Sequence, residues 1–415
     1  MVKGIVALSA FLFLASLFQD VQASSSIQNG PSPVLGRWRG VFKLRENVDV
    51  PFVFEIRKKA GNQLGIFFIN GKEQFDGGVV EVKGDSVFVY IDQFDNMMAL
   101  KFVGTDHLSG VLRKQNGSGT STLLTAELSN KSRFLLSGDE PAKNFSGTYQ
   151  VLFNSSNGKI DTAVGVFNQH GNQLSATFLR TTGDSRFLDG VVVGDRFYLS
   201  SFIGSGISYY EGRFNANGQV QGEKIAANAS TSFSGLLKTN ASLPDAYQLT
   251  MMKPGFSSFD FSFPDLEGRK ISLKDKQFEN KAVVLTLGGS WCPNCMDEAA
   301  FLAPWYKENK NRGVEVISIH YERSNDSVYA KKGMDRFKSR FGITYTQLFG
   351  GVADNNVVLS TLPALEKFIA FPTTIFLDRQ KKVMAIHTGF SGPATGEFYE
   401  SFKKEFNQHV EEILQ

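Results

Sequence analysis

The sequence reads Trp-Cys-Pro-Asn-Cys at residues 291–295, and this stretch holds the only two cysteines of the 415-residue chain. An apolar run of strand length, 283–288, comes directly before it, and apolar residues recur at helical spacing over 299–306. The pair therefore lies where a buried strand ends and a helix begins. Backbone N–H groups at a helix N-terminus carry partial positive charge, so they favour a thiolate at Cys292. Cys295, about one turn later, can reach Cys292 and close a disulfide.

The first residues have the pattern of a secretory signal peptide, predicted to span 1–23. Lys3 supplies a positive charge, 5–18 form a short apolar core, and 21–23 fit a small-x-small cleavage site. An uncleaved anchor is the alternative, but the core is short for a membrane span. The sequence thus predicts an exported chain that begins at Ser24 and is soluble after cleavage.

Stabilisation of the fold does not explain a single pair of close cysteines in an exported chain. A disulfide that closes a loop of about four residues constrains the unfolded chain little. Two thiolates without a second nearby pair make an incomplete zinc site, so we expect no metal and no other cofactor. The net charge is only +3 and no basic block stands out, which argues against a nucleic-acid partner. The pair is therefore interpreted as a redox-active dithiol.

The chain up to residue 245 has the pattern of antiparallel strands. Apolar and polar residues alternate over 52–57, 64–68 and 87–91, with turn residues between the runs. Similar stretches recur about 110 residues later, which indicates a duplication. The matched stretches are Gly61–Leu64 with Gly171–Leu174, Gly84-Asp85 with Gly194-Asp195, Trp38–Gly40 with Phe145–Gly147, and Gly78 and Gly110 with Gly190 and Gly222.

The duplication predicts two β units, 24–138 and 139–245, each a small barrel or sandwich; one composite β domain is also compatible. Their only histidines, His107 and His170, lie in polar turn-like sequence and are interpreted as surface residues. Alternation alone does not separate a filled barrel from one that holds a hydrophobic ligand. Docking of a partner protein and formation of a homodimer are equally compatible with these units.

Residues 246–415 follow a linker at 242–253 and alternate between strands and helices, which predicts an α/β domain with a central mixed sheet. We expect strands at 283–288, 314–319, 374–377 and 383–386, the last two as a hairpin, and helices after residue 295, over 328–341, over 362–368 and over 398–410.

Two motifs of this domain carry a family resemblance. Gly-Ser-Trp-Cys-Pro-Asn-Cys at 289–295, with Glu298, and Phe-Pro-Thr-Thr-Ile-Phe-Leu-Asp at 371–378 resemble the thioredoxin fold, and more narrowly the TlpA/ResA-type thiol–disulfide oxidoreductases of bacterial envelopes. The lead-in at 259–273 resembles the region those proteins share with peroxiredoxins of the AhpC/TSA group, and 386–392 is similar to versions from Bacteroidetes-like bacteria. The resemblance covers about residues 250–415.

The resemblance implies roles for single residues. Cys292 matches the attacking cysteine, expected to be the more exposed of the two, and Cys295 matches the resolving cysteine. Pro372 matches a cis-proline that faces the pair, so that the backbone of Phe371 can bind an extended substrate strand.

Three more residues of the motif complete the predicted site. Glu298 matches an acidic residue that moves protons at the thiols, although a first-turn acid is also favoured by the helix dipole alone. Trp291 and Pro293 flank Cys292 and are expected to contact substrate, although packing alone also explains Trp291. The family usually has proline before the second cysteine, whereas this chain has Asn294, and that dipeptide tunes the redox potential.

The resulting functional prediction is a periplasmic reductase of protein disulfides, re-reduced by a membrane thiol donor as the family resemblance implies. One alternative is an oxidase or isomerase of exported proteins. Another is a protein whose β units bind a ligand or partner while the redox domain acts as a sensor or tether.

Overall fold

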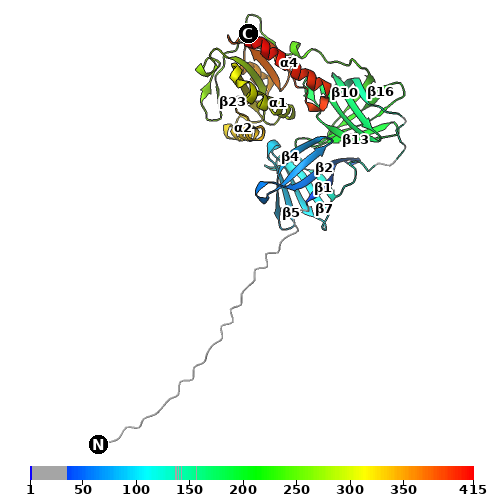
Figure 1. Cartoon of the computed structure of the whole chain (residues 1–415). Helices are drawn as coiled ribbons and strands as arrows, with labels where there is room; N and C mark the ends of the chain where they lie inside the picture. Colours follow the sequence, from blue (N-terminus) through cyan, green and yellow to red (C-terminus); the bar gives the residue numbers. More distant parts are fainter. Residues whose placement is uncertain (2–34, 136–137, 139, 142, 156) are drawn as a thin grey trace.

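The computed structural model describes Met1 and residues 35–135, 138, 140–141, 143–155 and 157–415 (Figure 1). The predicted signal peptide, apart from Met1, lies outside these residues. Of the helices in the described part of the chain, none combines the length and apolar character that a membrane span requires. Figure 1 shows two β units beside each other and an α/β domain that lies against both.

The first β unit is a closed antiparallel barrel, here called barrel 1, in which each strand pairs with the next and the last returns to the first. Alternate side chains point inward, and the interior holds Trp38, Phe42, Phe52, Phe54 and Phe68, all at most 1% exposed. Its strands are β1 (Gly36–Arg45), β2 (Val48–Lys58), β3 (Leu64–Asn70), β4 (Glu73–Lys83), β5 (Ser86–Ile91), β6 (Asn96–Phe102), β7 (His107–Lys114) and β8 (Thr122–Leu128).

The second β unit, barrel 2, closes because β10 pairs with both β9 and β11, while the short β12 pairs only with β11. Sequence left barrel and sandwich open, and both units are barrels. The matched glycines of the two repeats lie in equivalent strands or turns, although the duplication itself stays a prediction. The strands are β9 (Gly147–Asn154), β10 (Ile160–His170), β11 (Gln173–Arg180), β12 (Gly183–Asp184), β13 (Leu188–Val193), β14 (Arg196–Ser201), β15 (Ser208–Phe214), β16 (Gln219–Ile225) and β17 (Ser230–Leu237).

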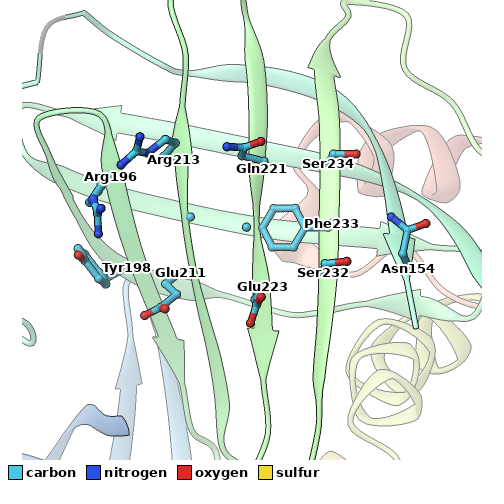
Figure 2. Close-up of a pocket in the computed structure, with 12 residues that line it drawn as sticks. Asn154, Arg196, Tyr198, Glu211, Arg213, Gln221, Glu223, Ser232, Phe233 and Ser234 are labelled. Atoms are coloured by element: carbon cyan, nitrogen blue, oxygen red, sulfur yellow. The ribbon is translucent and has the colours of Figure 1, made fainter. Parts of the chain in front are cut away.

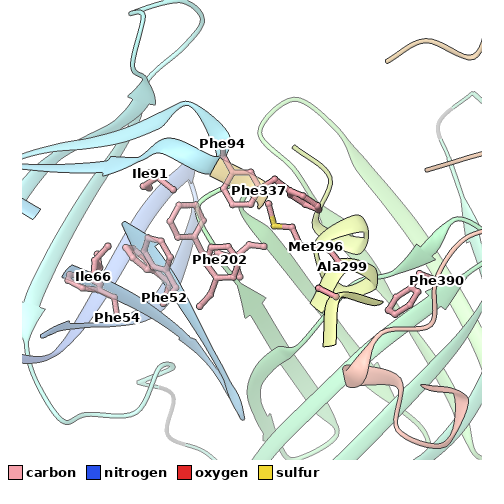
Figure 3. Packing of buried hydrophobic residues seen from close by; sticks show 14 of the residues in the cluster. Phe52, Phe54, Ile66, Ile91, Phe94, Phe202, Met296, Ala299, Phe337 and Phe390 are labelled. Atoms are coloured by element: carbon pink, nitrogen blue, oxygen red, sulfur yellow. The ribbon is translucent and has the colours of Figure 1, made fainter. Parts of the chain in front are cut away.

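Barrel 2 closes the mouth of barrel 1 with an aromatic side chain. The ring of Phe202 lies 4.8 Å from Phe42, 5.4 Å from Phe52 and 4.8 Å from Phe68, measured between ring centroids. Such edge-to-face contacts add to the free energy of burial. Figure 3 shows the same apolar cluster continuing to Met296 of the C-terminal domain. The phenylalanine-rich composition is therefore explained by packed cores and by the contact between domains.

The C-terminal domain has a five-stranded mixed sheet in the order β23-β22-β21-β25-β26. β21, β22 and β23 are parallel, and β25 and β26 form the predicted hairpin. The sheet strands are β21 (Ala282–Gly288), β22 (Val314–Glu322), β23 (Thr346–Val352), β25 (Thr373–Leu377) and β26 (Val383–Thr388), and the helices are α1 (Pro293–Asn309), α2 (Ser327–Phe341), α3 (Asn355–Thr361) and α4 (Glu397–Leu414). Short paired strands are β18 (Met251–Met252) with β24 (Leu365–Lys367) and β19 (Phe263–Pro264) with β20 (Lys270–Ile271).

The expected helix over 362–368 is wrong, because α3 ends at Thr361 and residues 365–367 form β24. The apolar side chains of Leu362, Leu365 and Phe368 are buried as the spacing suggested, but in an extended segment. β24 pairs with Met251–Met252, inside the stretch predicted to be a linker. The end of that linker is therefore part of the domain.

Candidate redox site

The two cysteines form a disulfide at the start of α1, with their Cα atoms 5.2 Å apart. The fully buried strand β21 leads into the site, and Cys292 is the N-cap residue of α1. Its Sγ accepts a hydrogen bond from the backbone N–H of Cys295 at 3.2 Å. The predicted strand-to-helix junction is confirmed. A thiolate at Cys292 would gain from this N–H and from the positive end of the helix.

The second motif lies beside Cys292. The Phe371–Pro372 peptide bond is cis, as predicted, and the carbonyl oxygen of Phe371 is 3.9 Å from Cys292 Sγ. The Trp291 ring contacts the Phe371 ring edge-on at 6.2 Å, and its Nε1–H donates to the carbonyl of Tyr321 at 2.9 Å. The structure thus brings Trp291, Cys292, Phe371 and Pro372 together around one sulfur.

Glu298 lies one turn after Cys295 on α1, and its side chain is buried. Burial raises the pKa of its carboxyl group to about 7, although the Thr374 hydroxyl, which donates at 2.7 Å, lowers it. A group with a pKa near neutrality can both accept and return a proton. The raised pKa is compatible with the proton-transfer role, which stays a prediction.

Both cysteines are nearly buried in this disulfide form. Cys292 is 5% exposed and Cys295 is 3% exposed, so Cys292 is the more exposed of the two, as expected, although by a small margin. Residues 181–186 of barrel 2, here called the covering segment, lie next to the pair and contact Pro293 and Asn294. A cleft of about 350 Å³ is left between the two domains, lined on one side by Cys292, Pro293, Asn294 and Phe371 and on the other by parts of barrel 2 that include this segment.

Asn294 makes the contact between the two sides. With its amide oriented to suit both groups, Asn294 accepts from the backbone N–H of Asp184 at 2.9 Å and donates to its carbonyl at 3.2 Å. Arg186 donates from Nη1 to the carbonyl of Pro293 at 2.8 Å. The residue that departs from the family pattern is thus the one that binds barrel 2.

A charged cluster joins all three domains beside this contact. Arg186 of barrel 2 forms ion pairs of 2.5 Å with Glu73 of barrel 1 and with Asp297 of α1. Asp184 accepts from the backbone N–H of Gly392 at 2.6 Å. Burial raises the pKa of Asp297 to about 7 despite Arg186, and burial also raises the pKa of Asp184. Burial alone would lower the pKa of Arg186, but Asp297 and Glu73 raise it overall, so the arginine stays charged.

Sequence reasoning missed the covering segment and this cluster. Arg186 and Glu73 are 113 residues apart, and nothing local marks them as partners. The one available signal was Asn294, which stands where the family usually has proline.

A larger hollow of about 610 Å³ lies on barrel 2 (Figure 2). Arg196 and Arg213 lie near one end, and Glu211 and Glu223 lie on neighbouring strands. It is lined by residues of β9 and β14–β17 and contains none of the predicted site residues. The cysteine cleft, although smaller, is the one with reactive groups.

Comparisons with known proteins concern the C-terminal part. Residues 255–386 match the model of the AhpC/TSA family. The chain is 28% identical over 157 residues to the thiol-disulfide oxidoreductase ResA of Halalkalibacterium halodurans, a match that covers 38% of this chain and 81% of that protein. It is 27% identical over 164 residues to ResA of Geobacillus thermodenitrificans, covering 40% and 80%. A solved thiol-disulfide oxidoreductase from Bacteroides fragilis is 23% identical, with a TM-score of 0.27, over 35% of this chain and 99% of that one.

Proposed function

Since the C-terminal domain of this chain is a thioredoxin-like thiol–disulfide oxidoreductase domain of the TlpA/ResA type, related to the AhpC/TSA family, we propose that the protein is exported to the periplasm and reduces disulfides of envelope proteins there. The observation that carries the proposal is the position of Cys292. Its sulfur accepts the N–H of Cys295 and lies beside the carbonyl of Phe371, which is the arrangement that a nucleophilic thiolate next to a substrate strand requires.

The reaction begins with the dithiol form. The Cys292 thiolate attacks one sulfur of the substrate disulfide, forms a mixed disulfide and expels the other substrate sulfur, which takes up a proton. Cys295 then loses its proton and attacks Cys292, which releases the second substrate thiol. Two electrons have passed to the substrate, and Cys292 and Cys295 are left as the disulfide seen in the structure.

Glu298 accepts the proton of Cys295 in the second step. It is buried on the same helix as Cys295, and the pKa of about 7 allows a share of the carboxyl groups to be ionised at neutral pH. The cysteine pair itself carries the electrons, so the proposed reaction needs no further cofactor.

Sustained turnover needs a donor that reduces the pair again. By analogy with the family, we assign this role to a membrane thiol protein on the same side of the membrane. The signal-like residues 1–23 support export. A homodimer formed through the barrels stays a prediction of the sequence.

The direction of electron flow is tested by the reduction potential of the Cys292–Cys295 pair in the full-length protein, equilibrated against glutathione. A value near roughly −270 mV, as in thioredoxin, supports the reductase, whereas a value near roughly −120 mV, as in DsbA, supports the oxidase alternative. The residues between the two cysteines tune the reduction potential, and this chain has Asn294 where the family usually has proline. The potential therefore has to be measured before the direction of electron flow can be assigned.

A further inference from the structure

The covering segment has no part in the electron transfer described above, yet it lines the same cleft as Cys292. We propose that residues 181–186 of barrel 2 are a steric filter, which admits disulfides on short or extended chains to Cys292 and excludes disulfides on the surface of a folded protein. This inference rests on the proposed function, because it names the class of substrate for the same site.

The first support is the space that remains. The cleft of about 350 Å³ is at the small end of the roughly 300–1,000 Å³ typical of small-ligand sites. A folded partner would need about 800 Å² of surface on each side for a specific interface. An extended segment can instead enter the cleft and bind the backbone of Phe371 by main-chain hydrogen bonds.

The second support is that the covering segment is fixed at several points. The backbone N–H and carbonyl of Asp184 both pair with the side-chain amide of Asn294, and the Asp184 carboxylate accepts from the backbone N–H of Gly392. Arg186 binds Pro293 and forms ion pairs with both Asp297 and Glu73. The segment is thus bound to the C-terminal domain at Pro293, Asn294, Asp297 and Gly392 and, through Glu73, to barrel 1.

The third support is the closeness of the two backbones. A Cβ atom on Gly183 would lie 1.6 Å from the Asn294 side chain, and the φ of Gly183 is +126°, a conformation that other residues rarely adopt. On the opposite side, a Cβ on Gly389 would lie 2.6 Å from the carbonyl oxygen of Thr181. A Cβ at either position would force a neighbour to shift, the Asn294 side chain in one case and the Thr181 backbone in the other, so glycine at both positions permits this close approach.

The test compares one disulfide in two settings. A short peptide with a single cystine loop is used free, and the same loop is also displayed on a folded carrier protein. The pre-reduced full-length protein is mixed with each, and the rate of a single turnover is followed by acid quenching and mass spectrometry of the thiols. We expect wild type to reduce the free peptide at least tenfold faster than the displayed loop.

Two variants should open the filter. Gly183→Ala places a Cβ against the Asn294 side chain at a φ that alanine rarely adopts, which should break this contact, and Arg186→Gln removes the ion pairs of the segment. In both we expect the ratio of free-peptide to displayed-loop rates to fall to within about threefold of one. Gly194 of barrel 2 also has a positive φ, +60°, but no neighbour within 4 Å, so Gly194→Ala is one control; Arg213→Gln, which removes an ion pair on the exposed surface of barrel 2, is the other. Both controls should keep the wild-type ratio.

A second measurement does not depend on the redox function. In the reduced protein, the rate of Cys292 alkylation is measured with iodoacetamide and with a maleimide on a 5-kDa polyethylene glycol, and each rate is divided by the rate of the same reagent with a free thiol. We expect the normalised rate to be at least tenfold higher for iodoacetamide. Equal relative rates in wild type, or equal turnover of the two disulfides, overturn the filter. If the filter is present by alkylation but wild type reduces neither disulfide, the proposed function is wrong instead.

Discussion

The two walls of the redox cleft are built in different ways. The wall from the C-terminal domain consists of two short motifs, 291–298 and 371–372. The conformation of each motif is local: the first begins helix α1, and the second contains the cis peptide bond. The wall from barrel 2 is a segment whose position depends on residues far away in the sequence, Glu73 and Asp297. The comparison teaches that local motifs supply the chemistry of this site, whereas long-range contacts decide what can reach it. Changes in the first wall should therefore abolish the reaction, and changes in the second should alter docking and access.

Cys292→Ser should have the largest effect. Serine is not a nucleophile toward sulfur under these conditions, so the rate of peptide-disulfide reduction should fall by a factor on the order of 10³ or more. The measurement is the single-turnover rate of the pre-reduced full-length variant, compared with that of pre-reduced wild type. The contacts of barrel 2 should be retained, because Arg186 and Asn294 are unchanged. A variant with more than a tenth of the wild-type rate would contradict the assigned nucleophile.

Glu298→Gln should come next and should slow the resolving step by roughly 100-fold, as expected for loss of a general base. Because burial raises the Glu298 pKa to about 7, the carboxylate form that accepts the proton increases as pH rises through 7. The wild-type resolving rate should therefore rise across this range, and the variant should lack that inflection. Glu308→Gln, at an exposed position on the same helix, is the control. If the resolving rate of Glu298→Gln still rises with pH near 7, the titrating group is not Glu298.

Arg186→Gln acts on the other wall and should weaken domain docking. Removing one partner of a buried ion pair typically costs about 3–5 kcal/mol, and here it leaves Glu73 and Asp297 without their cation. We expect about 3 kcal/mol, because the raised pKa of Asp297 lets that carboxyl group take up a proton. Urea unfolding followed by tryptophan fluorescence should show the transition at lower urea. A midpoint equal to that of Arg213→Gln would mean that the cluster does not hold the domains together.

Asn294→Ala should have the smallest effect. Asn294 belongs to the wall of the C-terminal domain and binds the wall of barrel 2, so this variant tests how much a single contact between the walls contributes. It loses two hydrogen bonds to Asp184, worth together about 1–3 kcal/mol. Hydrogen exchange of the Asp184 amide, measured by NMR, should become faster while exchange within β21 stays slow. Unchanged protection of Asp184 would show that Arg186 alone positions the covering segment.

Much of the fold followed from the sequence for a physical reason. Strands of period two and helices of period 3.6 repeat often enough to be recognised, so the two β units, the mixed sheet and the closing helix were predicted. The segment 362–368 failed because three apolar residues at a spacing of three fit a helix but equally fit an irregular stretch that ends in a short strand. Pairing with Met251–Met252, more than 100 residues earlier, decided the outcome.

The site divides in the same way. Cys292, Cys295 and Pro372 could be placed from local motifs, and the structure brings Cys292 and the Phe371–Pro372 turn together as expected. The covering segment beside Cys292 could not be predicted, because its position depends on contacts of barrel 2 and not on the motif. Asn294 was recognised as unusual, but its partner Asp184 becomes visible only once the domains are packed.

The most direct test of the central claim is covalent trapping by Cys295→Ser in the full-length protein. Without the resolving thiol, the mixed disulfide between Cys292 and a peptide substrate should persist, and intact mass spectrometry should show one peptide chain attached at Cys292. Cys292→Ser should show no such adduct. An absence of adduct in Cys295→Ser, together with a stable adduct at Cys295 in Cys292→Ser, would contradict the assignment of Cys292 as the attacking sulfur.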